Sequence, residues 1–307
     1  MLRLKNKIVL APMAGATNLA FRLICKEYGA SLMFTEMISA KAAIQKNKKT
    51  KKIAQTVKKE KPIALQLFGK DPKEIKEAAK TLEAGFDLID LNLGCPTKKI
   101  VDKGYGSALL KNKKKIREII SSLVKNSQKP ISAKIRIYKD TKETVKIAKT
   151  IEKAGASLLT IHARTAKQYY SGNIDINTIT EIKNNLSIPV IGNGDIRTEE
   201  QTREMLEETN CDYVMIARKC LGNPYFIKQC VHYLKTGKKL KIQTTKQRSK
   251  DFLKYMKLTE KYGISDSSLK HQAHYFTLGL KDSTRLRTEI NQLKTREEIQ
   301  NFFKGLR

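Results

Sequence analysis

Residues 82–96 read LEAGFDLIDLNLGCP and place a helix end, a strand and a turn in direct succession. Gly85 tolerates the left-handed backbone angles that commonly end a helix. The run from Leu88 to Leu93 is short, mostly apolar and bounded by turn residues, as a buried strand is. The same order of helical stretch, Gly or Asn, and apolar run recurs at 26–37, 152–163 and 207–218. The stretch therefore indicates one unit of a repeating helix–strand fold.

A second set of apolar runs lies between these units, and three of its four members open with proline, which suits the first residue of a strand. The runs are residues 8–12, 62–68, 130–137 and 189–194. Together the two sets predict eight strands that alternate with helices, which favours a parallel sheet covered on both faces. Eight units in this length indicate an α/β fold of the (β/α)8 TIM-barrel type. An open Rossmann sheet is disfavoured because Gly192-Asn193-Gly194 lacks the third glycine of the dinucleotide motif.

Three sequences have the composition of helix starts. Asp71-Pro72 combines an N-cap with a first-turn proline, Thr198 to Gln201 reads as a capping box, and Asn223-Pro224 repeats the cap-plus-proline pattern. From Gln243 onward apolar residues recur at helical spacing, which predicts a small C-terminal helical bundle after a lysine-rich linker at 233–250. We therefore expect a barrel domain at 1–238 and a helical domain at 243–307.

Composition restricts the classes of function. The 307 residues include 61 basic and 30 acidic side chains, a formal net charge of +31, which favours a polyanionic partner even if a biased genome supplies part of the lysine. No apolar run approaches the roughly 20 residues that span a bilayer, and the segment Met1–Lys7 is too short for a signal peptide. The five cysteines are an odd number without a CxxC pair, which predicts neither disulfides nor a metal site and fits a reducing cytoplasm.

Polar residues follow the predicted strands at one end of the barrel, where TIM barrels carry their active sites. In strand order these residues are Pro12, Met13 and Ala14; Gln66; Asn92 and Cys95; Lys134 and Arg136; His162 and Arg164; Asn193, Gly194 and Asp195; and Ala217 and Arg218. Their convergence on one rim predicts a binding site.

The last two strand ends favour phosphate binding, because Asn193-Gly194 and Ala217-Arg218 offer bare amides and one fixed cation. Simple turn chemistry is the alternative for the glycines. Lys134 lies inside an apolar strand and needs a partner, either a structural ion pair or the electron-rich edge of a flavin. Gln66 and His162 could contact the same ring, although His162 could equally be a buried core histidine.

Six motifs occur in an order that closely resembles the tRNA-dihydrouridine synthases. They are APMAG at 11–15, NLGCP at 92–96, AKIRI at 133–137, IHARTAKQYYSG at 161–172, IGNGDI at 191–196 and LGNPYF at 221–226. The resemblance spans essentially the whole chain. One departure is Ala217-Arg218, where the family usually has Gly-Arg; the arginine is kept.

The resemblance implies an FMN-dependent enzyme that reduces the C5=C6 bond of uridine in tRNA, with the D-loop as the expected location. FMN would be reduced by NADPH or NADH and give hydride to C6, while Cys95 gives the proton to C5. A free cysteine thiol mostly keeps its proton at neutral pH, which suits a general acid. The implied FMN contacts are Pro12, Met13, Ala14, Gln66, Lys134, His162, Asn193, Gly194, Asp195, Ala217 and Arg218, whereas Asn92 and Arg164 would hold the uracil.

Partners and competing functions complete the expectations. The implied partners are tRNA and NAD(P)H in the cytoplasm, without a membrane; no obligate protein partner is evident, which leaves a monomer open. A flavin barrel for a small pyrimidine, similar to dihydroorotate dehydrogenases, would share FMN but would need neither the helical tail nor the charge of +31. A non-catalytic RNA-binding barrel would have no use for Cys95. Tyr169 and Tyr170 could stack on RNA or simply pack, and no metal is expected at His271 and His274.

Overall fold

The computed structural model describes residues 4–306; residue 307 and residues 1–3, part of the segment considered above as a signal peptide, lie outside this range. Its single sheet is built of parallel strands that are almost entirely buried. The strands are β1 (Ile8–Leu10), β2 (Met33–Phe34), β3 (Ile38–Ser39), β4 (Ile63–Phe68), β5 (Leu88–Leu93), β6 (Ile131–Ile137), β7 (Leu158–Thr165), β8 (Val190–Asn193) and β9 (Tyr213–Ile216).

The sheet curls into a nearly closed barrel. Its strand order is β1-β9-β8-β7-β6-β5-β4-β2, and a single bridge between Val9 and Leu32 joins β1 to β2. Eight of these strands are the predicted ones, so the expected TIM barrel is confirmed. The ninth, β3, was not expected; it pairs with the far end of β4 after β2 has ended.

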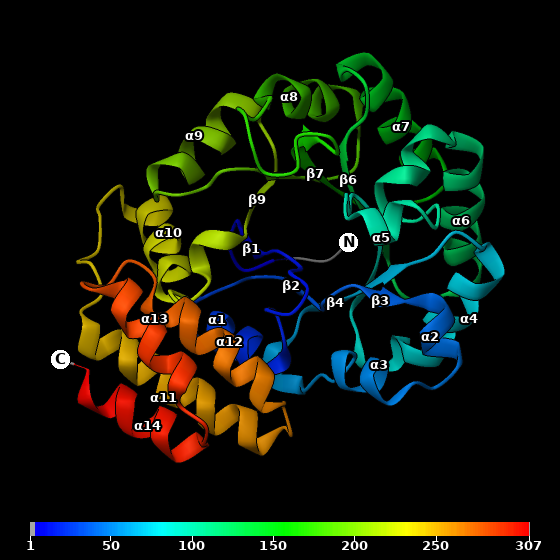
Figure 1. Cartoon of the computed structure of the whole chain (residues 1–307). Coiled ribbons are helices and arrows are strands. Elements are labelled where there is room, and N and C mark those ends of the chain that lie inside the picture. Colours follow the sequence, from blue (N-terminus) through cyan, green and yellow to red (C-terminus); the bar gives the residue numbers. More distant parts are fainter. Residues whose placement is uncertain (1–3, 307) are drawn as a thin grey trace.

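Helices surround the barrel as an outer ring (Figure 1). The helices of the barrel are α1 (Leu19–Glu27), α2 (Ala40–Ile44), α3 (Lys48–Ile53), α4 (Pro72–Leu82), α5 (Lys98–Val101), α6 (Lys113–Asn126), α7 (Thr141–Lys153), α8 (Ile176–Asn185), α9 (Glu200–Thr209) and α10 (Tyr225–Thr236). Inward faces of these helices, such as Ile116, Ile119 and Ile120 on α6, are fully buried against the sheet. Alternation of apolar helix faces with apolar strands thus builds one continuous core.

The predicted helix starts have mixed outcomes. Asp71 caps α4 through its bond from the Lys73 amide, as expected. Thr198 and Gln201 exchange the reciprocal bonds of a capping box just before α9. The prediction for Asn223 was wrong: α10 begins at Tyr225 with Pro224 as its N-cap, and the buried side-chain oxygen of Asn223 accepts no hydrogen bond among the described residues.

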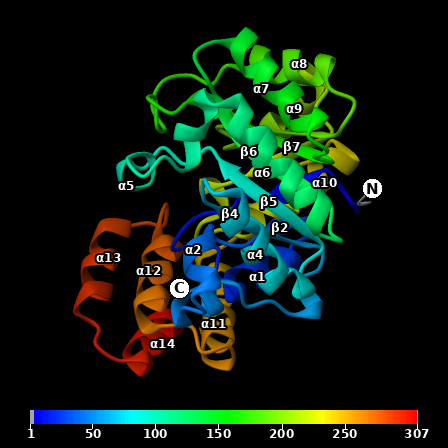
Figure 2. The same cartoon turned by 90° about the vertical axis from the view of Figure 1, so that its right-hand side faces the viewer.

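Four helices follow the barrel and pack as a block against α1: α11 (Thr245–Lys261), α12 (Asp266–Thr277), α13 (Ser283–Gln292) and α14 (Arg296–Gly305). We call them the C-terminal bundle. The predicted linker is shorter than expected, since α10 reaches Thr236 and α11 starts at Thr245. Seen from the side, α12 and α13 lie on the same side of the molecule as α5, which follows the carboxyl end of β5 (Figure 2). None of the helices described is both long and apolar enough to cross a bilayer.

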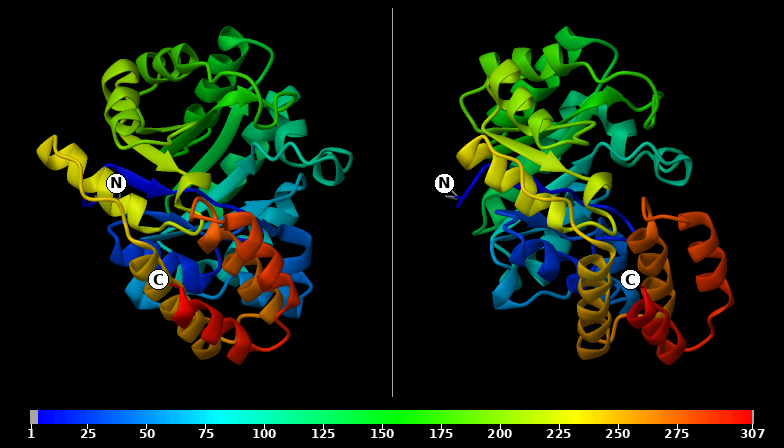
Figure 3. Two further views of the ribbon diagram at one scale, coloured as in Figure 1. Left: turned by 60° about the vertical axis from the view of Figure 1, so that its left-hand side comes forward. Right: turned by 90° about the vertical axis from the view of Figure 1, so that its left-hand side faces the viewer.

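The C-terminal bundle is joined to the barrel by buried polar contacts as well as apolar packing. Tyr255 on α11 accepts a bond from Asn18, and Gln272 on α12 donates to the Ala16 carbonyl. At Gly222, which has a positive φ of 65°, a side-chain carbon would lie 1.9 Å from the Tyr275 carbonyl oxygen. Only glycine permits the barrel backbone to approach α12 so closely. Figure 3 shows the C-terminal bundle, in orange and red, lying against the barrel.

We therefore expect Gly222→Ala to destabilise the chain by about 2 kcal/mol more than Gly263→Ala, because the first adds a backbone clash to the strain of a positive φ. Gly263 is a matched control, since its φ is 62° and nothing lies within 4 Å of the added carbon. Urea unfolding of both variants measures the difference. Equal losses would show that the approach of the two backbones can relax freely.

Candidate active site

A cavity of about 610 Å³ opens at the carboxyl ends of the strands. Of the fourteen residues to which the resemblance gives a role, thirteen line it: Pro12, Met13, Ala14, Gln66, Asn92, Cys95, Lys134, His162, Asn193, Gly194, Asp195, Ala217 and Arg218. Arg164 does not line it. Its volume lies in the range of sites that enclose a small ligand or cofactor.

Strand register explains why these distant residues meet. Asn92 on β5 is opposite Lys134 on β6, Arg136 is opposite His162 on β7, and His162 is opposite Asn193 on β8. Parallel strands place such partners side by side, and the two-residue period sends them to the same face of the sheet. The mouth of the barrel is therefore ringed by polar side chains.

Lys134 is the half-buried cation of this ring. Its Nζ donates to Asn193 Oδ1 at 3.1 Å, and none of the ion pairs within residues 4–306 includes it. Burial lowers the pKa of Lys134 from 10.5 to about 7, with a further decrease from Arg136 and a partial compensation by Asp90. The structural ion pair that the sequence left open is thus replaced by a single amide contact. A group at this pKa gains its charge readily when an anion approaches.

His162 faces the same cavity as a neutral ring. Burial lowers its pKa to about 2, and the charges of Lys134, Arg136, Arg164 and Arg218 act in the same direction. A neutral imidazole offers one donor and one acceptor, so His162 can hydrogen-bond a ring system without adding charge.

Cys95 lies on the turn after β5 and is half-buried, whereas the other four cysteines are buried. Asn92 Oδ1 accepts bonds from the Gly94 and Cys95 amides at 3.2 and 3.0 Å. The Cys95 carbonyl accepts from both the amide and the hydroxyl of Ser107, which closes the loop that carries α5. The thiol is therefore presented to the cavity on a turn held from both sides.

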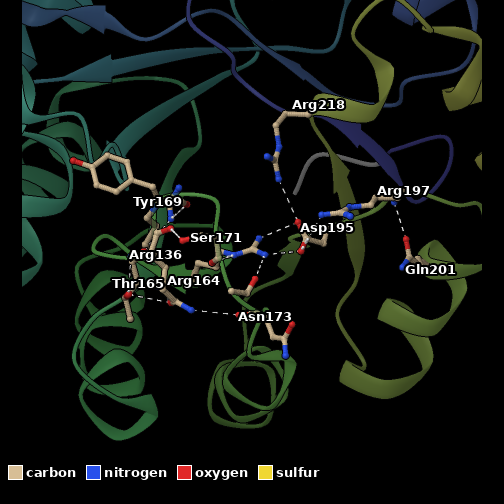
Figure 4. A network of polar contacts seen from close by, with 12 residues as sticks. Arg136, Arg164, Thr165, Tyr169, Ser171, Asn173, Asp195, Arg197, Gln201 and Arg218 are labelled. Atoms are coloured by element: carbon tan, nitrogen blue, oxygen red, sulfur yellow. Dashed lines mark hydrogen bonds and ion pairs between the residues drawn. The ribbon is translucent and has the colours of Figure 1, made fainter. Parts of the chain in front are cut away.

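Arg164 differs from the expectation that it holds a substrate. Its side chain is 1% exposed, and Figure 4 shows its guanidinium pointing to Asp195 and the 171–172 carbonyls. Its Nη1 donates to Asp195 Oδ1 at 2.9 Å, and its Nε donates to the Ser171 carbonyl at 3.0 Å. The two N–H groups of Nη2 donate to Asp195 Oδ2 and to the Gly172 carbonyl. Arg164 therefore contacts the loop after β7 and does not line the cavity.

Asp195 is the common anion of this region. Arg218 lies 3.3 Å from Asp195 Oδ1 and Arg197 lies 3.8 Å from Oδ2, in addition to the pair with Arg164. The hydrogen bond from Arg164 is the main cause that holds the pKa of Asp195 below its usual value. The side chain of Arg218 remains about half exposed, so this cation can also meet an anion from outside.

Several residues that line the cavity were given no cofactor or substrate role in the sequence analysis. Arg136 lies two positions after Lys134 and so shares its face, a signal that the strand period already carried. Tyr170, with a ring centroid 5.5 Å from Arg136 and 4.8 Å from Arg218, stands at the cavity wall. Tyr275 comes from α12, and no local pattern marks it. Further lining residues without a sequence signal are Met37, Arg197, Lys219 and Leu221.

Asp195→Asn is expected to lower the free energy of unfolding at pH 7 by about 3 kcal/mol, because the buried Arg164 loses its counter-charge. Since the pKa of Asp195 is depressed, the ion pair contributes fully above the unfolded carboxyl pKa of about 4 and is lost as the pH falls through the lower folded value. Urea unfolding at several pH values should show a constant deficit from pH 6 to 8 that shrinks only in acid. Glu118→Gln, which removes a fully exposed ion pair, is the control and should cost nothing measurable.

Lys134→Met should stabilise the ligand-free chain more at pH 6 than at pH 9. The folded pKa of about 7 lies below the unfolded value, so the unfolded chain binds more protons between about pH 7 and 10 and the parent becomes more stable as the pH rises. The gain in free energy of unfolding from the substitution should therefore be about 2 kcal/mol smaller at pH 9 than at pH 6. Urea unfolding at the two pH values measures it. An advantage independent of pH would mean that Lys134 keeps its charge throughout.

Comparisons with known proteins agree with this architecture. The family model described as dihydrouridine synthase (Dus) matches residues 9–305. The tRNA-dihydrouridine synthase B of Shewanella oneidensis is 36% identical over 96% of this chain and 94% of that protein. The probable tRNA-dihydrouridine synthase of Rickettsia conorii is 34% identical over 98% and 95%, and the synthase B of Pseudomonas aeruginosa is 37% identical over 77% and 72%.

Solved structures resemble the fold at low sequence identity. Histamine dehydrogenase from Rhizobium sp. 4-9 matches with a TM-score of 0.57 at 15% identity, over 83% of this chain and 49% of that one. The amine oxidase HisD from Pseudomonas geniculata N1 matches with a TM-score of 0.59 at 13% identity, over 77% and 48%. The chain thus spans about half the length of these two proteins, and the likeness supports the barrel fold alone. On the family match and the identity across nearly the whole chain, the protein belongs to the dihydrouridine synthase family.

Proposed function

We propose that this protein reduces the C5=C6 bond of uridine in tRNA to 5,6-dihydrouridine with FMN as its cofactor. The observation that carries the proposal is the shared cavity: the half-buried side chains of Cys95 and Lys134 line the same space. Family membership and relatives named tRNA-dihydrouridine synthase support the same reaction.

The residues present fit FMN at two places. A flavin ring needs a cation and hydrogen-bonding groups along its polar edge, and Lys134, Gln66 and His162 together meet that need. A phosphate needs free amides and a cation, which the loops after β8 and β9 provide with Gly194 and the half-exposed Arg218. Phosphates commonly bind at the last two strands of TIM barrels.

Eleven residues of the cavity wall are proposed to contact the cofactor. They are Pro12, Met13, Ala14, Gln66, Lys134, His162, Asn193, Gly194, Asp195, Ala217 and Arg218. When bound and reduced, FMN supplies the hydride that uracil C6 receives. Lys134 places a positive charge beside the ring, and its pKa of about 7 keeps both protonation states accessible near neutral pH. NADPH or NADH is proposed as the source of the electrons.

The chain itself supplies the proton. Cys95 Sγ holds it at the mouth of the cavity, 3.4 Å from the Thr97 hydroxyl, and transfers it to C5 while solvent later restores the thiol. Asn92 lines the cavity beside Cys95; its oxygen already accepts the Gly94 and Cys95 amides, so its Nδ2 group is the part proposed to donate to a uracil carbonyl. Arg164 is proposed to act on the substrate only through the loop after β7, because its side chain is buried outside the cavity lining and four of its five donors are engaged.

Charge and shape favour tRNA over a free pyrimidine. A formal net charge of +31 attracts a polyanion. Tyr275 brings the C-terminal bundle to the edge of the cavity, so that a large substrate would contact the barrel and the bundle together. A uridine must leave its stack to reach a barrel mouth, and the additional contacts offset that cost of a few kcal/mol.

Cys95→Ala should keep its flavin and oxidise NADPH in the absence of tRNA, yet lose at least about 100-fold in dihydrouridine formation, because the proton donor is gone. Mass spectrometry of tRNA isolated from cells that lack this gene, before and after incubation with each protein, measures the product. NADPH oxidation by the same variant is the internal control. Normal turnover by the variant would remove Cys95 from the reaction, and absence of product with the parent protein would remove the proposed function.

A further inference from the structure

A chain of buried hydrogen bonds runs beneath the floor of the cavity and ends at the Cys95 turn. Ser132 Oγ and Gln66 Nε2 donate to the two oxygens of Asp90 at 2.5 and 2.7 Å. Asn92 Nδ2 donates to Gln66 Oε1 at 2.9 Å, and Asn92 Oδ1 accepts the amides of Gly94 and Cys95. Asp90 and Ser132 are fully buried, and Gln66 and Asn92 nearly so.

The register of three strands builds this chain. Gln66 on β4, Asp90 on β5 and Ser132 on β6 form one row across the sheet, and Asn92 lies two residues further along β5. The side chains of Asp90 and Asn92 therefore share a face, with Gln66 close enough to reach both.

We propose that Asp90 is a positioning residue that sets the orientation of both amides and thereby holds the Cys95 turn. An ionised carboxylate can only accept, so Gln66 must present its NH2 group to Asp90 and its oxygen to Asn92. Asn92 must then present its NH2 group to Gln66, which leaves its oxygen for the Gly94 and Cys95 amides. The reversed amides would place NH2 groups against backbone N–H groups, where no hydrogen bond forms.

The opposite end of this chain of hydrogen bonds requires the same orientation of the two amides. A backbone N–H can only donate, so the two turn amides call for an oxygen from Asn92 just as Asp90 calls for a nitrogen from Gln66. The chain is satisfied only when an acceptor occupies position 90. Dependence on a distant acceptor is the property that separates positioning from simple space filling.

The cost of burying Asp90 argues against a purely structural role. Burial raises its pKa to about 6, against the lowering effects of its bonds from Ser132 and Gln66 and of the charge on Lys134. A carboxylate removed from water destabilises the fold unless its bonds compensate, and an apolar residue would fill the site at lower cost. Leu88, two residues before Asp90 on β5 and on the same face, is of that apolar kind.

The test measures the turn directly. Iodoacetamide alkylation of the native full-length chain, followed by mass spectrometry, reports Cys95 because the other four thiols are buried. Asp90→Leu removes the acceptor and Gln66→Met removes the link, so both should free the turn and speed alkylation about fivefold or more, the factor carried by one net hydrogen bond. Asp90→Asn keeps an acceptor for Gln66, with its NH2 group toward the Ser132 hydroxyl.

Asp90→Asn and Ser132→Ala are therefore expected to remain within about twofold of the parent rate, because each keeps the bond between position 90 and Gln66. Parent-like alkylation in both Asp90→Leu and Gln66→Met would overturn the inference, as would an Asp90→Asn rate equal to that of Asp90→Leu. If Asp90→Leu fails to fold, the contrast between Gln66→Met and Asp90→Asn decides.

The importance of holding Cys95 in place for catalysis rests on the proposed function. The alkylation rate itself does not depend on that function. It is measured without tRNA or turnover, so a negative result leaves uridine reduction standing. Conversely, failure of uridine reduction leaves the measured link between Asp90 and Cys95 intact.

Discussion

The alignment of neighbouring parallel strands is the constraint on which the site depends. Because β5 to β8 are in fixed register, Asn92, Lys134, His162 and Asn193 emerge in adjacent positions at the barrel mouth. A shift by one residue would turn these polar groups toward the outer helices and place apolar side chains in the cavity. The register is held in turn by the alternate side chains of the same strands, such as Ile135 and Ile161, which are fully buried in the core between the sheet and the helices.

Two cations at this end of the barrel are stabilised in different ways. Lys134 has an amide partner and a pKa lowered to about 7, so its charge is conditional on what binds nearby. Arg164, by contrast, keeps a permanent charge and is matched by Asp195 and by two loop carbonyls. Guanidinium groups suit such fixed arrangements because their donors form a rigid fork. The first group can respond to a ligand, while the second holds the loop around it.

The barrel and the C-terminal bundle meet next to the same mouth. Gly222 allows the barrel backbone to reach α12, and Tyr275 of that helix then lines the cavity. The bundle is thus positioned by contacts that involve backbone atoms and buried polar groups, such as the bond from Asn18 to Tyr255. Since these contacts leave little freedom for sliding, the bundle and the strand ends present one continuous surface to a large substrate.

The sequence alone determined the eight core strands, the order of helix and strand, and thirteen residues of the cavity, because apolar periodicity and strand ends are local properties of the chain. It also placed Cys95 on a turn after β5. What only the tertiary structure decided concerns partners that are distant along the chain. Arg164 stands at a strand end like its neighbours, yet Asp195 and the loop carbonyls engage its side chain. Tyr275 reaches the cavity from a helix more than a hundred residues after His162, and the Asn223 side chain is buried where a cap was expected. Local patterns record which way a residue points along its own element, whereas hydrogen-bond partners and burial depend on how the elements pack.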